Sequence, residues 1–256
     1  PRRRPPAFAR GLPPRCALDW LAAGWGDLRA APGPSLAYGF LVFLLSVGVT
    51  AGLWRLQLLY LVLPAVSGFL IVGPFIAIGL YEQSRRRAAR EPMGLVAILA
   101  VRPASGAQLA YAGLLLGLLV LFWLRAADLL YALFFGLSPF PGAAEAFANL
   151  LSTPRGWALV MVGSGIGALF AAFAFAISLF SIPMMLERRV DALTAMGRSF
   201  AMTLQNLPVV LVWGVIVAAG LVLCVATGFL ALIVIFPVLG HGTWHVWRAI
   251  SGGGES

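Results

Sequence analysis

The chain has 256 residues, of which 61% are hydrophobic and 11% are charged, and its mean hydropathy is +0.94. A water-soluble domain carries about 25% charged residues, so this composition excludes an ordinary soluble protein and predicts a chain solvated by lipid. The net charge is +9 and every basic residue is an arginine, but the arginines lie beside apolar segments without an aromatic stacking platform, so we expect no nucleic-acid partner.

Six apolar segments are long enough to cross a bilayer, which takes about 20 helical residues. They cover residues 35–54, 57–81, 107–135, 156–186, 207–226 and 228–250. We therefore predict an all-α, polytopic membrane protein with six transmembrane helices arranged as three hairpins. A basic cytoplasmic tail at 1–15 precedes a single membrane domain at 16–250, and a short tail at 251–256 follows it.

Three shorter helices are expected just before the odd-numbered spans, at 16–30, 93–101 and 187–204. In the first, an apolar stripe at helical spacing lies opposite polar residues. The stripe consists of Leu18, Leu21, Ala22, Trp25 and Leu28, and the polar residues are Asp19, Asp27 and Arg29. In the last of the three helices the stripe is Val190, Leu193, Phe200 and Leu204. Such helices are typical of the membrane interface.

The distribution of the arginines predicts the orientation of the spans. With the N-terminus in the cytoplasm, 15 of the 18 arginines lie inside, Arg55 and Arg155 lie outside, and Arg125 lies within a span. Cytoplasmic loops of membrane proteins are enriched in basic residues, so we expect both termini in the cytoplasm.

A cluster of arginines follows the cytoplasmic ends of the second and fourth spans. It consists of Arg85, Arg86, Arg87, Arg90, Arg188 and Arg189. We expect this cluster to contact anionic lipid headgroups. The acidic residues beside it, Glu82, Glu187 and Asp191, are expected to form salt bridges with these arginines.

Two charged residues, Arg125 and Asp128, lie inside the third predicted span. Charged residues within a membrane are functional candidates by default, because an unpaired charge there costs about 2.5–3.5 kcal/mol. At a spacing of three residues they can pair within one helix, so we expect a structural pair that faces the bundle. A role in transport or in a proton path, and a position at the interface, are the alternatives.

The two histidines of the chain, His241 and His245, share one face of the sixth predicted span. They are weak candidates for a metal or cofactor site. The alternative is a polar belt at headgroup level, in which the histidines accompany the tryptophans of HGTWHVWR. We expect no cofactor, no metal and no catalytic residue. The two cysteines, Cys16 and Cys224, are expected to be unpaired.

Three prolines, Pro74, Pro183 and Pro237, fall in the cytoplasmic halves of the even-numbered spans, where each can kink its helix. In the fourth span, Gly163, Gly165 and Gly167 are expected to permit close helix packing.

Four stretches together resemble an uncharacterised family of bacterial six-span inner-membrane proteins, catalogued as a domain of unknown function. They are LDWLAAGWGDLRAAPGPSLAYG, GPFIAIGLYEQSRRRAAREP, FSIPMMLERRVDALTAM and GFLALIVIFPVLGHGTWHVWRA. Some members carry the label "cytochrome c oxidase subunit I-like". A catalytic oxidase core needs six histidines and this chain has two, so the label does not imply oxidase activity here.

From these observations we expect a non-enzymatic, multi-pass protein of the bacterial inner membrane. The expected role is an accessory, assembly or scaffold subunit of a larger respiratory or photosynthetic complex, with the bilayer and other membrane subunits as partners. A small-molecule, lipid or ion transporter that uses Arg125 and Asp128 is the alternative, and a metal or cofactor binder that uses His241 and His245 is the second alternative.

Overall fold

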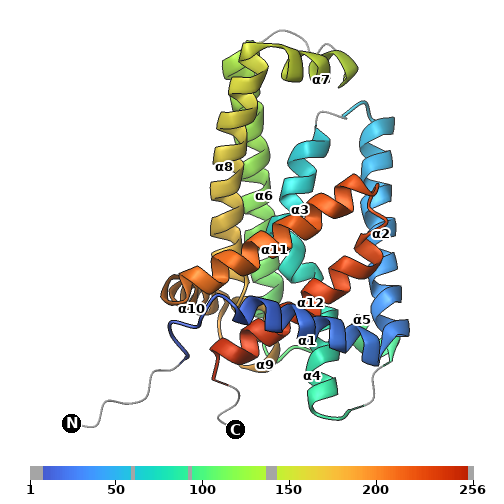
Figure 1. Cartoon of the computed structure of the whole chain (residues 1–256), viewed down its shortest axis with the longest axis vertical. Coiled ribbons are helices and arrows are strands. Elements are labelled where there is room, and N and C mark those ends of the chain that lie inside the picture. Colours follow the sequence, from blue (N-terminus) through green and yellow to red (C-terminus); the bar gives the residue numbers. More distant parts are fainter. Residues whose placement is uncertain (1–7, 59–60, 92–93, 137–142, 253–256) are drawn as a thin grey trace, which may run out of the picture. The chain divides into compact units, whose positions relative to one another are not determined.

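The computed structural model describes residues 8–58, 61–91, 94–136 and 143–252, and within these ranges every regular element is a helix. The residues outside these ranges include most of the predicted basic tail, with Arg2, Arg3 and Arg4. In chain order the helices are α1 (Cys16–Ala30), α2 (Pro32–Arg55), α3 (Val62–Ile76), α4 (Ile78–Ala88), α5 (Leu95–Leu99), α6 (Gly106–Phe135), α7 (Ala143–Ser152), α8 (Pro154–Ser178), α9 (Ser181–Glu187), α10 (Ala192–Gln205), α11 (Leu207–Ala226) and α12 (Leu232–Ile250) (Figure 1). The predicted all-α fold is confirmed.

Four segments of the described chain are long and apolar enough to cross a membrane: Pro32–Arg55, Gly106–Phe135, Pro154–Glu187 and Leu207–Ala226. They agree with the first, third, fourth and fifth predicted spans, so the protein is a multi-pass membrane protein. The second predicted span, 57–81, is divided between α3 and α4, and the sixth, 228–250, becomes α12. The count of six spans stays a prediction.

The three prolines act differently. Pro74 precedes the end of α3 at Ile76, and Pro183 follows the break between α8 and α9, whereas α12 continues through Pro237. Proline has no N–H, so the carbonyl of Ile233, one turn earlier in α12, lacks its usual donor. The backbone of Gly39 in α2 packs directly against that carbonyl. A Cβ added to Gly39 would also clash with Pro237, because it would lie 2.9 Å from Cγ of the proline.

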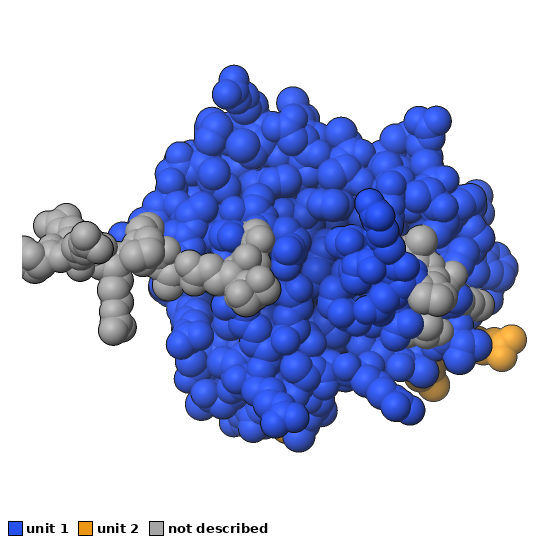
Figure 2. All heavy atoms as spheres, turned by 90° about the horizontal axis from the view of Figure 1, so that it is seen from below, with its two compact units in different colours: residues 1–47, 74–112, 176–256 blue, residues 48–73, 113–175 orange. Residues whose placement is uncertain are grey.

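Within the segment predicted as one membrane domain, the contacts define two compact units. Unit 1 comprises residues 1–47, 74–112 and 176–256, and unit 2 comprises residues 48–73 and 113–175. In the space-filling view of Figure 2 the atoms of unit 1 form one continuous surface.

In unit 2, Gly167 of α8 lies against the Trp123 ring of α6, while Gly163 and Gly165 have open space around them. Only one of the three glycines therefore mediates the expected close packing.

The core of unit 1 is built from large aromatic side chains and from glycines that let helices approach. Trp213, Trp244 and Trp247 are fully buried, and Trp20 meets Trp213 edge to face, with ring centroids 6.3 Å apart. Helix α1 packs along α12 (Figure 1). A Cβ on Gly24 of α1 would lie 2.6 Å from the backbone nitrogen of Gly242 in α12. The two backbones therefore touch where a larger residue would separate them.

The two amphipathic helices α1 and α10 bury faces of mixed small, polar and apolar side chains and expose most of the predicted apolar stripes. In α1, Ala17, Trp20, Gly24, Asp27 and Leu28 are buried, whereas Leu18 and Trp25 of the predicted stripe are exposed. In α10, the buried face is Ala192, Ala195, Met196, Ser199, Met202 and Thr203, and the predicted stripe is exposed at Leu193, Phe200 and Leu204. An outward apolar face agrees with helices that lie at a membrane interface.

The first testable consequence concerns Gly24. We expect Gly24→Ala to destabilise unit 1 by roughly 1–3 kcal/mol, because the new methyl group meets rigid backbone in α12 rather than a mobile side chain. Thermal unfolding of the detergent-solubilised protein measures the effect.

The matched control is Gly26→Ala in the same helix, where nothing lies within 4 Å of the added Cβ. The higher helix propensity of alanine should stabilise that variant by up to about 1 kcal/mol. Equal melting temperatures for the two variants would show that α1 and α12 are not in backbone contact.

Candidate functional site

The structure gathers polar side chains at the point in unit 1 where α1, α2, α4 and α12 meet. Asp27 comes from α1, Ser35 from α2, Gln83 and Ser84 from α4, and His241 from α12, and each of these five residues is buried. We call this group, together with Arg87 of α4 and His245 of α12, the buried polar cluster. Buried polar groups of this kind must be hydrogen-bonded to be tolerated, so their partners decide what the cluster does.

The carboxylate of Asp27 is the acceptor on which the cluster converges. Its Oδ2 accepts a hydrogen bond from Ser84 Oγ at 2.5 Å and one from His245 Nε2 at 3.0 Å. Its Oδ1 accepts a hydrogen bond from the guanidinium of Arg87. One side chain of α1 therefore binds both α4 and α12.

His241 is held at both ring nitrogens by serine hydroxyls. Its Nδ1 lies 2.8 Å from Ser84 Oγ, and its Nε2 lies 3.1 Å from Ser35 Oγ. Ser84 has one hydroxyl hydrogen, which it donates to Asp27, so the hydrogen in the bond with His241 must come from Nδ1. Nε2 of this neutral ring is then the acceptor of the Ser35 hydroxyl.

Ser35 Oγ in turn accepts a hydrogen bond from Gln83 Nε2 at 2.9 Å. Along the path that runs from Gln83 through Ser35, His241 and Ser84 to Asp27, each side chain therefore donates to the next. The oxygen of the same amide, Gln83 Oε1, is buried and has no hydrogen-bond partner in the described chain. The hydrogen bonds that link the other side chains run mostly from one member of the cluster to another, as expected of a structural network.

The surroundings of Asp27 favour its ionised form. Burial raises the pKa of the carboxyl, but the hydrogen bonds from His245 and Ser84 lower it more, so the net pKa lies below the ordinary value of 3.8. The cluster therefore holds a carboxylate at neutral pH.

The predicted pair of histidines is thus brought together, but not around an open metal position. Both nitrogens of His241 and the Nε2 of His245 face protein partners. In the part of the chain that the structure describes, no group of three or more His, Cys, Asp or Glu side chains is arranged to hold a metal ion. The contacts favour a structural role over the alternative of a metal or cofactor binder.

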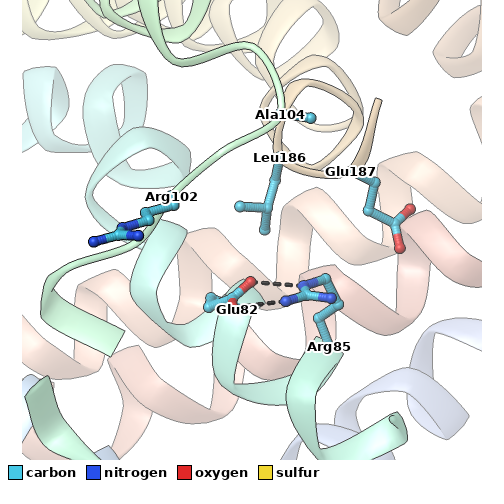
Figure 3. A pocket seen from close by; sticks show the side chains of 6 residues that line it. All are labelled: Glu82, Arg85, Arg102, Ala104, Leu186 and Glu187. Carbon is cyan, nitrogen blue, oxygen red and sulfur yellow. Dashed lines mark hydrogen bonds and ion pairs between the residues drawn. The ribbon is translucent and has the colours of Figure 1, made fainter. Parts of the chain in front are cut away.

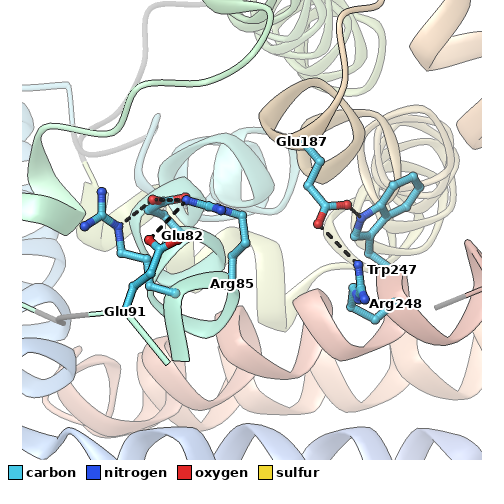
Figure 4. A network of polar contacts seen from close by, with 7 residues as sticks. Glu82, Arg85, Glu91, Glu187, Trp247 and Arg248 are labelled. Atoms are coloured by element: carbon cyan, nitrogen blue, oxygen red, sulfur yellow. Dashed lines mark hydrogen bonds and ion pairs between the residues drawn. The ribbon is translucent and has the colours of Figure 1, made fainter. Parts of the chain in front are cut away.

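A second network joins the acidic residues of α4 and α9 to basic residues (Figure 4). Arg85 approaches Glu82 with two nitrogens, at 2.7 and 2.8 Å, and Arg86 donates to the same carboxylate at 2.6 Å. Glu187 accepts from Trp247 Nε1 at 2.8 Å and from Arg248 at 3.4 Å. Burial raises the pKa of Glu82, but the two arginines lower it more, so its net pKa lies below 4.5.

The arginine cluster predicted to contact lipid is therefore divided. Arg85, Arg86 and Arg87 are ion-paired within unit 1, and Arg188 stacks over the ring of Trp247. Arg90 and Arg189 are exposed. Of the predicted salt bridges, that of Glu82 forms as expected and that of Glu187 forms with Arg248 instead. Asp191 instead caps α10, where its side chain accepts from the backbone nitrogen of Thr194.

A pocket of about 330 Å³ lies beside this network (Figure 3). It is lined by Glu82, Arg85, Arg102, Ala104, Leu186 and Glu187, all of unit 1. Arg102 and Glu187 stand on opposite sides of Leu186 in this view. Sequence reasoning had counted Arg102 only toward the orientation of the spans.

The predicted intramembrane pair also forms, in unit 2. Arg125 Nη1 lies 3.2 Å from Asp128 Oδ2, one turn apart on α6. The side chain of Arg125 is 82% exposed and that of Asp128 is 42% exposed. Contrary to the expectation that the pair faces the bundle, the side chain of Arg125 is therefore largely exposed, and that of Asp128 is only partly covered.

Sequence reasoning missed Asp27, Ser35, Gln83 and Ser84 altogether. The available signal was weak: Trp20, Gly24 and Asp27 share one face of α1 at a spacing of four and then three residues, and a glycine on that face permits close packing. Nothing in the order of residues indicated that the partners would come from the far end of the chain.

Residues 62–187 match a family described as "Predicted integral membrane protein (DUF2189)". The match confirms the predicted resemblance to an uncharacterised family of membrane proteins, and its description names no activity. It includes Gln83, Ser84, Arg102 and Glu187, whereas Asp27 and both histidines lie outside it. Searches among curated proteins and among solved structures found no match.

A second testable consequence concerns Asp27. We expect Asp27→Asn to destabilise the protein by roughly 1–3 kcal/mol, because the new amide group has to place a donor against the guanidinium of Arg87 or against the donors of Ser84 and His245. Asp19→Asn is the matched control on the exposed face of the same helix and should change stability by less than about 0.5 kcal/mol. Thermal unfolding of both variants decides whether the cluster is structural.

A third consequence is the response to acid. A carboxyl whose pKa is lower in the folded state contributes stability above its unfolded pKa of about 3.9, and this contribution is lost as the pH falls through the folded pKa. The melting temperature should therefore fall as the pH is lowered below about 4, and it should fall less steeply in Asp27→Asn, where only Glu82 and other carboxyls remain to be protonated. Parallel slopes for the two proteins would mean that Asp27 has an ordinary pKa.

Proposed function

We propose that this protein is a non-enzymatic accessory or assembly subunit of a larger complex in the bacterial inner membrane. The observation that carries the proposal is the outward position of Arg125 on a helix long and apolar enough to span a membrane. Charged residues in membrane helices almost always face protein or water, because lipid solvates them poorly. A neighbouring protein that covers this face would supply that environment.

The surroundings of Arg125 support this reading. On α6 exposed leucines recur at spacings of three and four residues, except for one interval of eight residues that Arg125 divides in half, and this is the pattern by which helices pack against each other. The stripe is Leu114, Leu118, Leu121, Leu129 and Leu133, all exposed. Arg125 falls in the middle of this stripe and not beyond its end, so apolar surface continues on both sides of the charge.

The partner that fits is another membrane helix with an apolar face and one acceptor side chain, an acid or an amide. Arg125 carries five donors, and its single contact with Asp128 at 3.2 Å leaves most of them for such an acceptor. The positive-inside distribution of arginines supports the proposed inner membrane, and the oxidase-like label of the resembling family suggests a respiratory complex as the first partner to examine.

The transport alternative has less support. It requires Arg125 and Asp128 to line a path inside the protein, whereas the side chain of Arg125 is largely exposed. The buried polar cluster of unit 1 is closed by its own hydrogen bonds, which favours a structural role for its carboxylate and histidines.

The test is photo-crosslinking in native membranes. A photoreactive residue placed at Leu121, one turn before Arg125, should give one discrete adduct with a different membrane protein, and Arg125→Leu should reduce that adduct at unchanged abundance. The matched control is the same photoreactive residue at Val215 of α11, which is 68% exposed in another span and should give no discrete adduct.

Two results would contradict the proposal. Lack of a discrete adduct from Leu121 would mean that lipid covers this face. An adduct that contains only two copies of this chain would indicate self-association in place of an accessory role.

A further inference from the structure

The pocket beside Glu82 lies at the level where two spans leave the membrane. Arg102 precedes the span Gly106–Phe135 by four residues, and Glu187 is the last residue of the span Pro154–Glu187. The ends of transmembrane helices lie at the headgroup region of the bilayer. A volume of about 330 Å³ is that of a small ligand site.

The wall of the pocket is fixed by backbone hydrogen bonds between the two span ends. Ala104 N donates to Leu186 O at 3.0 Å, and Ser105 N donates to Met185 O at 3.1 Å. The hydroxyl of Ser105 adds a bond to Arg188 O at 2.9 Å and accepts one from Val190 N at 2.8 Å. The segment that carries Arg102 is therefore tied to the segment that carries Glu187.

The two arginines of the pocket differ in whether an acidic side chain is already paired with them. Arg85 is neutralised by two contacts with Glu82, whereas Arg102 is exposed and makes no hydrogen bond or ion pair with the described residues. A free guanidinium at headgroup level is suited to a phosphate. The carboxylates of Glu82 and Glu187 are each paired with arginine, but a carboxylate has about four acceptor positions, so both keep lone pairs that can accept from an ammonium group.

We propose that this pocket binds a phosphate ester that also carries a primary amine, the chemistry of a phosphoethanolamine headgroup. The phosphate is bound by Arg102, and the ammonium group lies against the acidic side of the pocket, at Glu187 and Glu82 (Figure 3). Two sources offer this chemistry: phosphatidylethanolamine in the bilayer and soluble phosphoethanolamine. The site does not depend on the proposed accessory role, since its residues belong to unit 1 and Arg125 belongs to unit 2.

The test is native mass spectrometry of the purified protein in mixed micelles that contain phosphatidylethanolamine, phosphatidylcholine or phosphatidylglycerol. Phosphatidylethanolamine should be retained in preference to the other two, because choline has no N–H to donate and the glycerol headgroup has no cation. Arg102→Gln should lower its retention about tenfold, the effect of losing one charge-assisted contact. Arg29→Gln, another exposed arginine of unit 1, is the matched control and should retain the lipid as the natural protein does.

Soluble phosphoethanolamine, added to lipid-free micelles and followed by calorimetry, distinguishes the two sources. Saturable binding that Arg102→Gln weakens, without lipid retention, supports the site with a soluble ligand. Equal retention of the three lipids, or equal loss in the Arg102 and Arg29 variants, overturns the proposal. Melting temperatures of both variants should equal that of the natural protein, because both side chains are exposed.

Discussion

The arrangement of the helices in unit 1 depends on the hydrogen bonds of the Asp27 carboxylate. It accepts hydrogen bonds from Ser84 and Arg87 of α4 and from His245 of α12, so a single group fixes three helices. This arrangement requires α1 and α12 to be unusually close, which the paired glycines Gly24 and Gly242 permit. The short helix α1 is consequently part of the core and not a loosely attached element at its edge.

The same polar contacts decide which charges of unit 1 remain available. Arginines with an acidic partner nearby are used to hold helices together, as Arg85 and Arg86 are by Glu82. Arg102 has no such partner within the described chain, although it lines the same pocket as Arg85. The arginines of unit 1 thus include some that hold helices together and others that have no acidic partner among the described residues. The difference lies in whether a carboxylate is within reach.

In unit 2 the charged pair does not join different helices. Its charged pair, Arg125 and Asp128, is a local contact within one helix, and it projects from an apolar stripe instead of closing a core. A guanidinium in such a position is costly in lipid and useful in a protein interface, because it combines several donors with a stem that packs against apolar side chains. The proposed interaction with a partner therefore involves α6, whereas the buried polar cluster holds the helices of unit 1 together.

The sequence by itself determined the membrane class, the positions of most helices and the polar pairs formed within one helix. The pairs Arg125 with Asp128 and Glu82 with Arg85 follow from a spacing of three residues, which brings side chains together in any helix. The two amphipathic helices α1 and α10 were also evident, since their apolar stripes are periodic. These features are local, so they do not depend on where the rest of the chain goes.

The tertiary structure alone decided the buried polar cluster and the fate of the prolines. Asp27 and His245 are 218 residues apart, and an acid on the polar face of an amphipathic helix is ordinarily solvated, so no local pattern predicts their contact. Pro74 and Pro183 lie beside helix breaks, whereas Pro237 lies within a continuous helix whose freed carbonyl is covered by Gly39. Whether a buried charge or an unpaired carbonyl is tolerated depends on the atoms packed against it, and those atoms come from distant parts of the chain.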